Sequence, residues 1–297
     1  MEIHHVRSHR SNLDPSHAFA VIAHGDPQMF HRLTQKLLEI GPVFAHLDAK
    51  TNSHGWADAN PEVIFLDKRV KVYWGHWSMV EATMRLMERA LTDPAVNRIT
   101  LVSGAHYLLW SPAEIAARSV SAIDVIAARE APNMPDGSRP EVEYGRRFVA
   151  SRFPDSLGHR LANAFINRVV RVGRPLKWRD LVGPEGMRAG SQWWSLTRRT
   201  AELLVRRVRV DDELVRYFKK VNCPDEKVFA TLFAELDQTP HVSGTTFAKW
   251  RDGPNPVRME LGDLEVARED PGFWFARKFS SSADAVLLDW LDNKMQK

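Results

Sequence analysis

Cysteine is almost absent from the 297 residues of this sequence, which contain only Cys223. One thiol can form neither an intrachain disulfide nor a thiolate zinc cluster, so the composition predicts a protein of the cytoplasm. Long apolar runs are lacking as well. None approaches the roughly 20 residues needed to cross a bilayer, and the polar lead of residues 1–17 has no signal-peptide core. We therefore expect a cytoplasmic protein, with peripheral contact at the inner membrane as the alternative.

Several motifs that mark common enzyme classes are also missing. The sequence has no Gly-x-Gly-x-x-Gly, no P-loop, no His-Glu-x-x-His and no Gly-x-Ser-x-Gly, which disfavours dehydrogenase, P-loop kinase, zinc protease and serine hydrolase functions. It has no Asp-x-Asp pair either, the spacing that commonly holds a divalent cation in nucleotide-sugar transferases. We expect no metal site and no cofactor.

The composition that remains is that of a folded, basic protein. Hydrophobic residues make up 44% and charged residues 26% of the chain, enough apolar material for a packed core. A net charge of +4 and a pI of about 9.2 favour an anionic partner, such as a nucleotide diphosphate, an anionic lipid surface or a nucleic acid. The arginine-rich segment His159–Arg179 fits an anion or membrane contact, or simply a solvated basic face.

Strand-like and helix-like segments alternate along the chain. Short apolar runs predict strands at Ala18–His24, Val43–Leu47, Val63–Leu66, Val70–Tyr73, Arg98–Val102 and Gln192–Leu196, and an edge or loop strand at Phe273–Phe279. Helical spacing predicts helices over 29–40, 78–91, 198–208, about 224–236 and 282–291. This order predicts one α/β domain over residues 18–297, with a Rossmann-like, mostly parallel sheet flanked by helices and a helix and loop insertion at 133–190.

Polar residues at the ends of these strands are the first candidates for a site. Ligands of parallel sheets bind beyond the carboxyl ends of the strands, where Asp48, Trp74-Gly75 and Ser103-Gly104 fall. Without a metal, a leaving diphosphate needs fixed cations to neutralise its charge. Arg277 and Lys278 stand together between aromatic residues; one of the two is expected to face solvent, and Lys278 is our candidate ligand.

A carboxylate and three tryptophans complete the candidates. Glu226 follows Pro224 at a predicted helix start, where an ionised carboxylate suits a general base. The alternative is a helix-capping glutamate. Trp250 lies in a polar, turn-rich segment and could stack on the apolar face of a sugar, as could Trp193 or Trp194. Core packing is the alternative for each of these rings.

Taken together and in order, eight segments resemble the core-2/I-branching N-acetylglucosaminyltransferase and peptide O-xylosyltransferase family: AVIAH, HLDAK, WGHWSMVEA, LVSGAHYLLWSPAEI, GSQWWSLTR, CPDEKVFATL, KWRDG and FARKF. The resemblance runs from about Phe19 to Leu291. It implies a GT-A-type fold with one nucleotide-sugar site that works without a metal. One departure is that Tyr107 is followed by Leu108, where relatives have proline.

The resemblance also implies roles for individual residues. The family's catalytic base matches Glu226, and its cationic diphosphate ligand matches Lys278, with Arg277 beside it. A second family arginine matches Arg258 best, with Arg251 as a rival.

Two further positions match the family's substrate contacts. The acceptor-stacking tryptophan matches Trp250, and Asp48 matches an aspartate near the nucleotide base.

The resemblance also implies a reaction. We expect an inverting transferase that moves N-acetylglucosamine or xylose from a UDP-sugar to a glycan or lipid-linked oligosaccharide. We expect it to act in bacterial surface polysaccharide synthesis, with no nucleic-acid partner. The alternative is a non-catalytic nucleotide-sugar or glycan-binding protein on the same fold.

Overall fold

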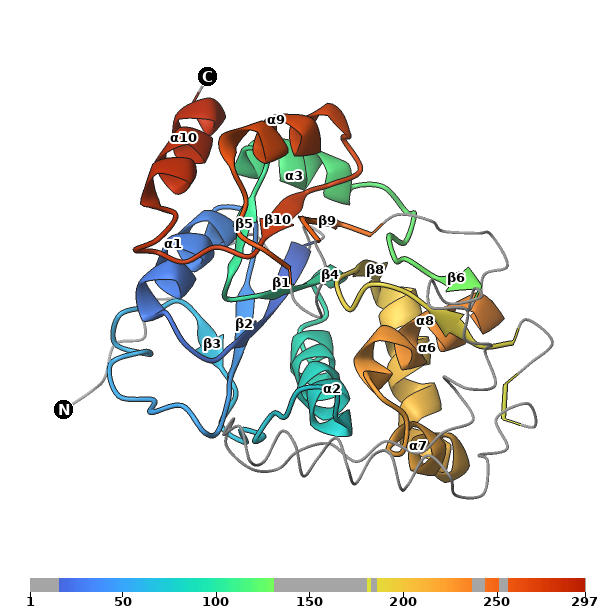
Figure 1. Cartoon of the computed structure of the whole chain (residues 1–297). Coiled ribbons are helices and arrows are strands. Elements are labelled where there is room, and N and C mark those ends of the chain that lie inside the picture. Colours follow the sequence, from blue (N-terminus) through green and yellow to red (C-terminus); the bar gives the residue numbers. More distant parts are fainter. Residues whose placement is uncertain (1–15, 131–180, 183–185, 237–243, 251–255, 297) are drawn as a thin grey trace, which may run out of the picture.

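The computed structural model describes residues 16–130, 181–182, 186–236, 244–250 and 256–296 (Figure 1). Most of the predicted insertion at 133–190, the basic segment His159–Arg179 and Arg251 lie outside the described residues. Among the helices that are described, none combines the length and the apolar character needed to cross a membrane.

A five-stranded sheet forms the centre of the molecule, in the order β3-β2-β1-β4-β8. Its strands are β1 (Ser16–Ala23), β2 (Val43–Leu47), β3 (Ile64–Phe65), β4 (Val96–Ser103) and β8 (Ser195–Thr197). The first four strands are parallel, and β8 pairs antiparallel with β4. The predicted α/β architecture with a mixed, mostly parallel sheet is therefore confirmed.

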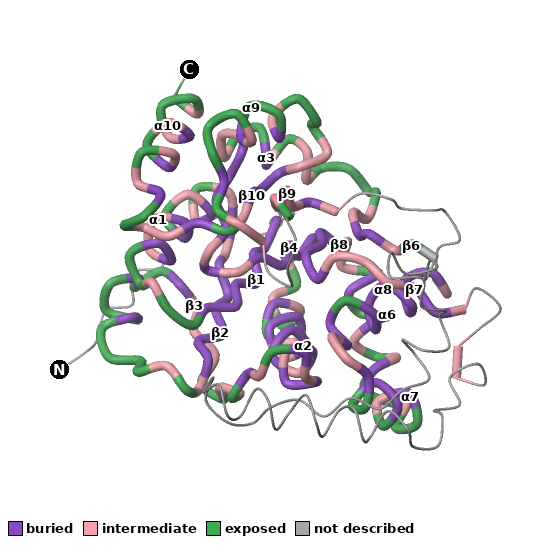
Figure 2. The backbone as a smooth tube through the Cα atoms, viewed as in Figure 1, coloured by how far each residue is buried: buried purple, intermediate pink, exposed green. Residues whose placement is uncertain are grey.

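Both faces of this sheet are buried, because alternate residues of each strand enter different cores. In β1 one face presents Ala18, Ala20 and Ile22, and the other presents Phe19, Val21 and Ala23. The first core is covered by α2 (Trp77–Leu91), α6 (Arg198–Val210), α7 (Asp212–Phe218) and α8 (Val228–Leu236). The second is covered by α1 (Pro27–Leu38), α10 (Ala285–Met295) and a smaller sheet. Figure 2 shows this buried backbone running through the middle of the molecule.

The smaller sheet has the order β5-β10-β9, with strands β5 (His106–Leu108), β9 (Thr246–Ala248) and β10 (Phe275–Arg277). The prediction of an edge or loop strand at Phe273–Phe279 is wrong in this respect, since β10 lies in the middle of three strands. Helices α3 (Pro112–Ser119) and α9 (Leu261–Glu269) lie together above this sheet (Figure 1). A short ribbon of β6 (Arg129–Glu130) and β7 (Arg188–Ala189) lies beside α8.

Two other predictions need correction. Val70–Tyr73 is not a strand, because Val70 makes its backbone hydrogen bonds to the His46 ring and to Ala49 instead of to a neighbouring strand. The helix expected over about 224–236 is a 3-10 turn, η1 (Pro224–Glu226), followed by α8. Lys227, with φ −123°, separates the two because its backbone is not helical.

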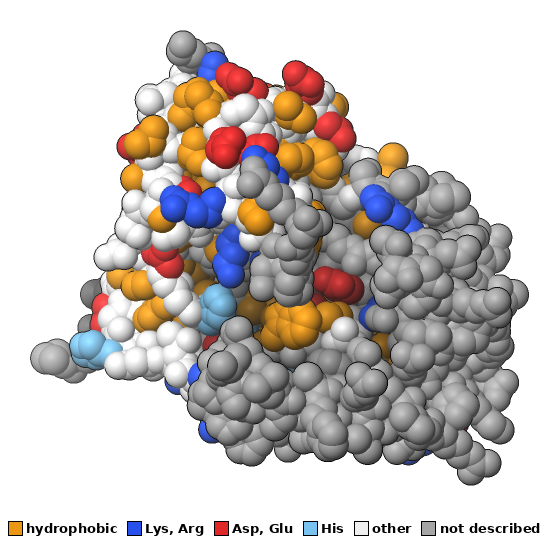
Figure 3. Space-filling view, viewed as in Figure 1, with side chains coloured by type: hydrophobic (Ala, Val, Ile, Leu, Met, Phe, Trp, Pro, Cys, Tyr) orange, Lys and Arg blue, Asp and Glu red, His pale blue; other side chains and the backbone are white. Residues whose placement is uncertain are grey.

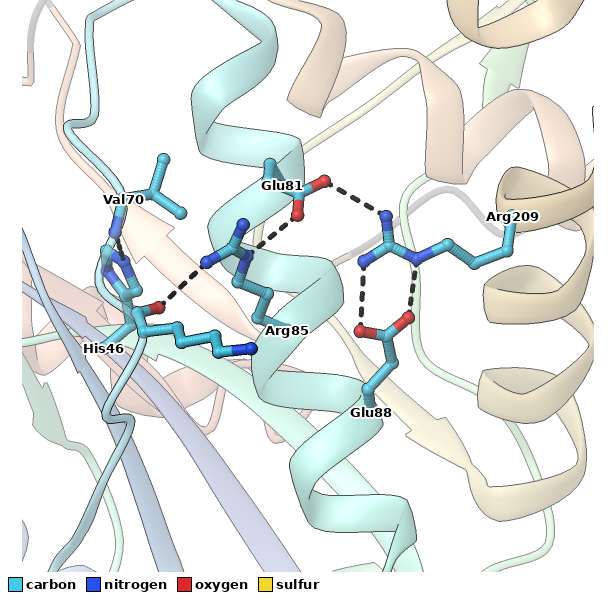
Figure 4. Close-up of polar contacts among 7 residues, drawn as sticks. His46, Val70, Glu81, Arg85, Glu88 and Arg209 are labelled. Carbon is cyan, nitrogen blue, oxygen red and sulfur yellow. Dashed lines mark hydrogen bonds and ion pairs between the residues drawn. The ribbon is translucent and has the colours of Figure 1, made fainter. Parts of the chain in front are cut away.

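An ion-pair network on the outer side of α2 holds α6 in place (Figure 4). Arg209 of α6 pairs with Glu88 at 2.6 Å and with Glu81 at 3.2 Å. Arg85 pairs with the same Glu81 at 2.8 Å and donates to the Lys68 carbonyl oxygen at 3.0 Å. Single exposed pairs stabilise proteins little, but the shared Glu81 links α2, α6 and the segment before Val70.

Two buried histidines give the protein a pH-dependent stability. Burial lowers the pKa of His46 to about 4 and that of His17 to about 3. The His46 Nε2 accepts the Val70 N–H at 2.8 Å, so it must be unprotonated (Figure 4). The unfolded chain binds these protons near pH 6.5, whereas the folded chain does not, so acid favours unfolding.

We expect the free energy of unfolding to fall by about 2 kcal/mol per histidine as the pH drops from about 7 to about 5. Urea unfolding across this range measures the effect. His46→Gln keeps an oxygen acceptor for the Val70 N–H but cannot titrate, so its stability should depend less steeply on pH. Parallel pH profiles for the variant and the wild type would contradict the assignment.

Candidate active site

The carboxyl ends of the three central strands meet at one edge of the main sheet. Asp48, after β2, donates its N–H to the Ala23 carbonyl at the end of β1 at 2.9 Å. Gly104, after β4, donates to the Ile22 carbonyl at 2.9 Å. His24 follows β1 directly, between these two neighbours. Asp48 and Gly104 therefore lie at one edge of the sheet as predicted, whereas Trp74-Gly75 follows a segment that is not a strand.

The smaller sheet brings Arg277 to the same edge. Strand β5 begins at His106, just after the turn that ends β4, and pairs antiparallel with β10 so that Arg277 faces His106. The Phe279 N–H then bonds to the Ala105 carbonyl at 3.0 Å, which holds the segment after β10 against this turn. The His106 Nδ1 lies 2.7 Å from the Ser103 Oγ.

The turn that carries Glu226 is held from both sides. The Glu226 carbonyl accepts the Gly190 N–H at 2.9 Å, and the Cys223 N–H donates to the Gly75 carbonyl at 3.2 Å. Position 190 requires glycine, because the Gly190 backbone also packs against Ala127, and a Cβ there would lie 1.7 Å from the Ala127 carbonyl oxygen. Gly75 has φ +68°, a conformation that favours glycine. Glu226 itself is exposed.

Arg277 and the carboxyls of the Glu226 turn interact electrostatically. Burial lowers the pKa of Arg277 to about 10, against the opposing charges of Glu226 and Asp225. Burial, followed by the charge of Glu226, raises the pKa of Asp225 to about 7. The Arg277 guanidinium carbon lies 4.8 Å from the centre of the Trp193 ring. The structure thus places the predicted base and one predicted cation in the same site.

Lys278 and Asp48 lie on the strand-end side of this site. Lys278 is open to solvent on part of its surface. The burial of the rest, followed by the charge of Arg277, lowers its pKa. The Asp48 carboxylate accepts the backbone N–H groups of Lys50 and Val72 at 2.9 and 3.4 Å, and its other oxygen lies 3.4 Å from the Lys50 Nζ. Asp48 therefore organises the loop after β2. A direct contact between Asp48 and a nucleotide base stays a prediction.

Arg258 has a protein partner in this structure. Its guanidinium pairs with Asp284 at 2.8 Å, and the other Asp284 oxygen accepts the Ser280 N–H at 2.8 Å. This ion pair lies at the end of the segment that follows Lys278. The Arg258 side chain is nevertheless 64% exposed, and its contact with a diphosphate stays a prediction.

The tryptophans differ sharply in exposure. Trp250, at the end of β9, is 57% exposed, so its ring is open to a ligand as predicted for an acceptor contact. Trp193 is only 5% exposed, with Arg277 against its face and the His106 ring 4.5 Å away, and Trp194 is fully buried. The prediction that Trp193 stacks on an acceptor is therefore corrected: its ring supports Arg277 from within the protein.

Sequence reasoning missed three ionisable residues of this site. Asp225, His24 and His106 belong to the motifs PDE, AVIAH and SGAH, so their positions were visible in the sequence, although the burial of Asp225 and His106 was not. No group of three or more His, Cys, Asp or Glu residues suited to a metal ion occurs in the described ranges. Figure 3 shows a hollow on this face where basic, acidic, histidine and hydrophobic surfaces adjoin.

Comparisons with known proteins agree with the resemblance. The chain is 23% identical to glycosyltransferase BC10 of rice (Oryza sativa subsp. japonica). The alignment covers 75% of this chain and 62% of the rice protein. A solved structure titled as a glucose-1-phosphate thymidylyltransferase from Bacillus anthracis, in complex with sucrose, matches 69% of this chain and 83% of its own at 9% identity. A TM-score of 0.30 is too low to support an inference from it. Residues 17–133 and 168–268 match the family described as core-2/I-branching enzyme, and the chain therefore belongs to this family.

Proposed function

We propose that this protein is an inverting, metal-independent glycosyltransferase that uses a UDP-sugar as donor. The observation that supports this proposal best is the position of Arg277. Its charge acts on Glu226 and Asp225 on one side, and it is followed by Lys278, whose charge acts on His24 beside Asp48 on the other. A proton acceptor and two cations thus border one exposed site.

The chemistry that follows is a single displacement. Glu226 takes the proton of an acceptor hydroxyl, and the hydroxyl oxygen attacks the anomeric carbon of an α-linked UDP-sugar. The bond from that carbon to the diphosphate oxygen breaks, and its electron pair leaves with UDP. Arg277 and Lys278 neutralise the charge that develops on the diphosphate. Because the hydroxyl attacks from the face opposite the α-linked diphosphate, the configuration at the anomeric carbon inverts and the product is β-linked.

The substrates of this reaction are proposed from the family. The donor is UDP-N-acetylglucosamine or UDP-xylose. The acceptor is a carbohydrate hydroxyl of a bacterial surface polysaccharide or lipid-linked oligosaccharide. Trp250 offers the exposed ring on which an acceptor sugar could stack.

Release of UDP from a panel of UDP-sugars, measured with and without a chelator, tests this function. We expect release from one donor at equal rates in both conditions. A non-catalytic binding protein would release no UDP, and loss of release with chelator would exclude metal independence. In thermal unfolding, UDP at about a hundred times its dissociation constant should add about 2.7 kcal/mol of stability.

Replacing Lys278 tests the diphosphate contact separately. Lys278→Met keeps much of the side-chain length but removes the charge, so we expect UDP to bind about 10- to 100-fold more weakly, the loss of one hydrogen bond between charged groups. Lys294→Met, on the exposed side of α10, serves as the matched control. Equal UDP affinity in both variants would remove Lys278 from the site.

A further inference from the structure

Two buried ionisable residues flank Glu226. Asp225 is 9% exposed and Lys227 is 5% exposed, whereas Glu226 between them is open to solvent. Lysine is almost never buried unless its ammonium has a partner, because the ammonium loses its water in the interior. The partner of Lys227 therefore shows what this buried cation does for the residue beside it.

The Lys227 side chain closes the turn that carries Glu226. Its Nζ donates to the Asn222 carbonyl oxygen at 2.6 Å, five positions back along the chain. Its backbone N–H donates to the Pro224 carbonyl oxygen at 3.2 Å, and its own carbonyl oxygen accepts the Thr231 N–H at 2.8 Å, at the start of α8. Lys227 thus holds the beginning of the turn with its side chain and joins the end of the turn to the helix with its backbone.

The beginning of this turn has an uncommon backbone conformation. Cys223 has φ +46°, and it is one of two non-glycine residues with a positive φ in the described part of the chain. A residue with a Cβ loses about 1–2 kcal/mol in this conformation, which persists only where surrounding contacts enforce it. The bond from Lys227 to Asn222 spans Cys223 and is one such contact.

The direction of the Glu226 side chain depends on this closed turn. A general base must lie within hydrogen-bond reach of the proton it removes, and a displacement of about 1 Å can lower a rate about 100-fold. We infer that Lys227 is a positioning residue, whose buried ammonium closes the turn from Asn222 and so holds the Glu226 carboxylate where it accepts the proton. This inference rests on the proposed function and adds to it a residue that acts through Glu226 from the interior.

Replacing Lys227 tests this role. Lys227→Met removes the ammonium and keeps an unbranched side chain of similar length. We expect UDP release at saturating donor to fall by about 10- to 100-fold, while the calorimetric affinity for UDP stays that of the wild type. Rates are counted per UDP-binding site, so that unfolded protein does not enter the comparison. Lys220→Met, an exposed lysine after α7, is the matched control and should keep the wild-type rate.

A double-mutant cycle with Glu226→Gln separates positioning from a general loss of structure. Once the base is gone, Lys227 has no carboxylate left to position. In the Glu226→Gln background, Lys227→Met should therefore change the rate by no more than about twofold. An equal loss of rate in both backgrounds would overturn the inference, as would a loss of UDP affinity as large as the loss of rate.

The outcomes also distinguish this inference from the proposed function. A Lys227→Met enzyme with the wild-type rate overturns the inference and leaves the proposed function intact. A wild type that releases UDP from no donor overturns both. If Lys227→Met does not fold, Lys227→Gln, which keeps a polar group in the interior but removes the ammonium, takes its place in the same cycle and is judged by the same two comparisons.

Discussion

Glu226→Gln should lower the rate of UDP release by about 10²- to 10⁴-fold, the usual contribution of a general base. Glutamine has nearly the same shape as glutamate, and the backbone bonds that hold the turn, from Gly190 to Glu226 and from Cys223 to Gly75, do not involve the side chain. The variant should therefore fold and bind UDP as the wild type does. What it loses is the ability to accept a proton from the attacking hydroxyl.

Steady-state rates of UDP release and calorimetric UDP affinity, measured on the same preparations, separate the base from a binding role. Glu265→Gln, an exposed glutamate of α9, is the matched control and should keep the wild-type rate. A Glu226→Gln enzyme that releases UDP as fast as this control would end the assignment. A variant that also loses UDP binding would instead assign Glu226 to the donor.

Arg98→Leu should destabilise the fold by about 3–5 kcal/mol, because an unsatisfied buried carbonyl oxygen costs about 1–3 kcal/mol and several would lose this donor. Arg98 is only 2% exposed, yet it is a cation on β4. Its guanidinium donates to the carbonyl oxygens of Ser119 at 3.0 Å, Ile123 at 2.9 Å and Ser195 at 3.2 Å, and to that of Ser121. Leucine would leave these oxygens without their donor in the interior.

Urea unfolding measures this loss, which is a large part of the 5–15 kcal/mol that typically stabilises a domain. Arg216→Leu, on the exposed side of α7, controls for loss of a positive charge and should change stability by about 0.5 kcal/mol or less. Arg98→Lys keeps the charge but not the fork of donors, so it should fall between the two. A change for Arg98→Leu as small as that of Arg216→Leu would contradict this account.

Much of the proposed site could be chosen from short motifs. Glu226, Arg277 and Lys278 were chosen because a carboxylate at a helix start and adjacent cations on a strand have chemical meaning without coordinates. The same reasoning chose Trp193, and failed there, because the sequence does not record that this ring is buried whereas that of Trp250 is exposed. The sequence reasoning also preferred Lys278 over Arg277 as the diphosphate ligand, whereas in the structure the charges of both act on neighbouring groups of the proposed site.

The sequence alone determined the family and most of the strands of the main sheet, in their order along the chain. Both depend on residues close together in the chain, through motifs of a few residues and through the periods of strands and helices. Only the tertiary structure decided that Arg98 and Trp193 are buried, that β10 is a central strand, and that the Asp225 pKa lies near 7. Each of these depends on contacts between distant segments, such as the Arg98 guanidinium on the Ser195 carbonyl oxygen, 97 positions away. No local pattern records which distant groups will displace water from a side chain.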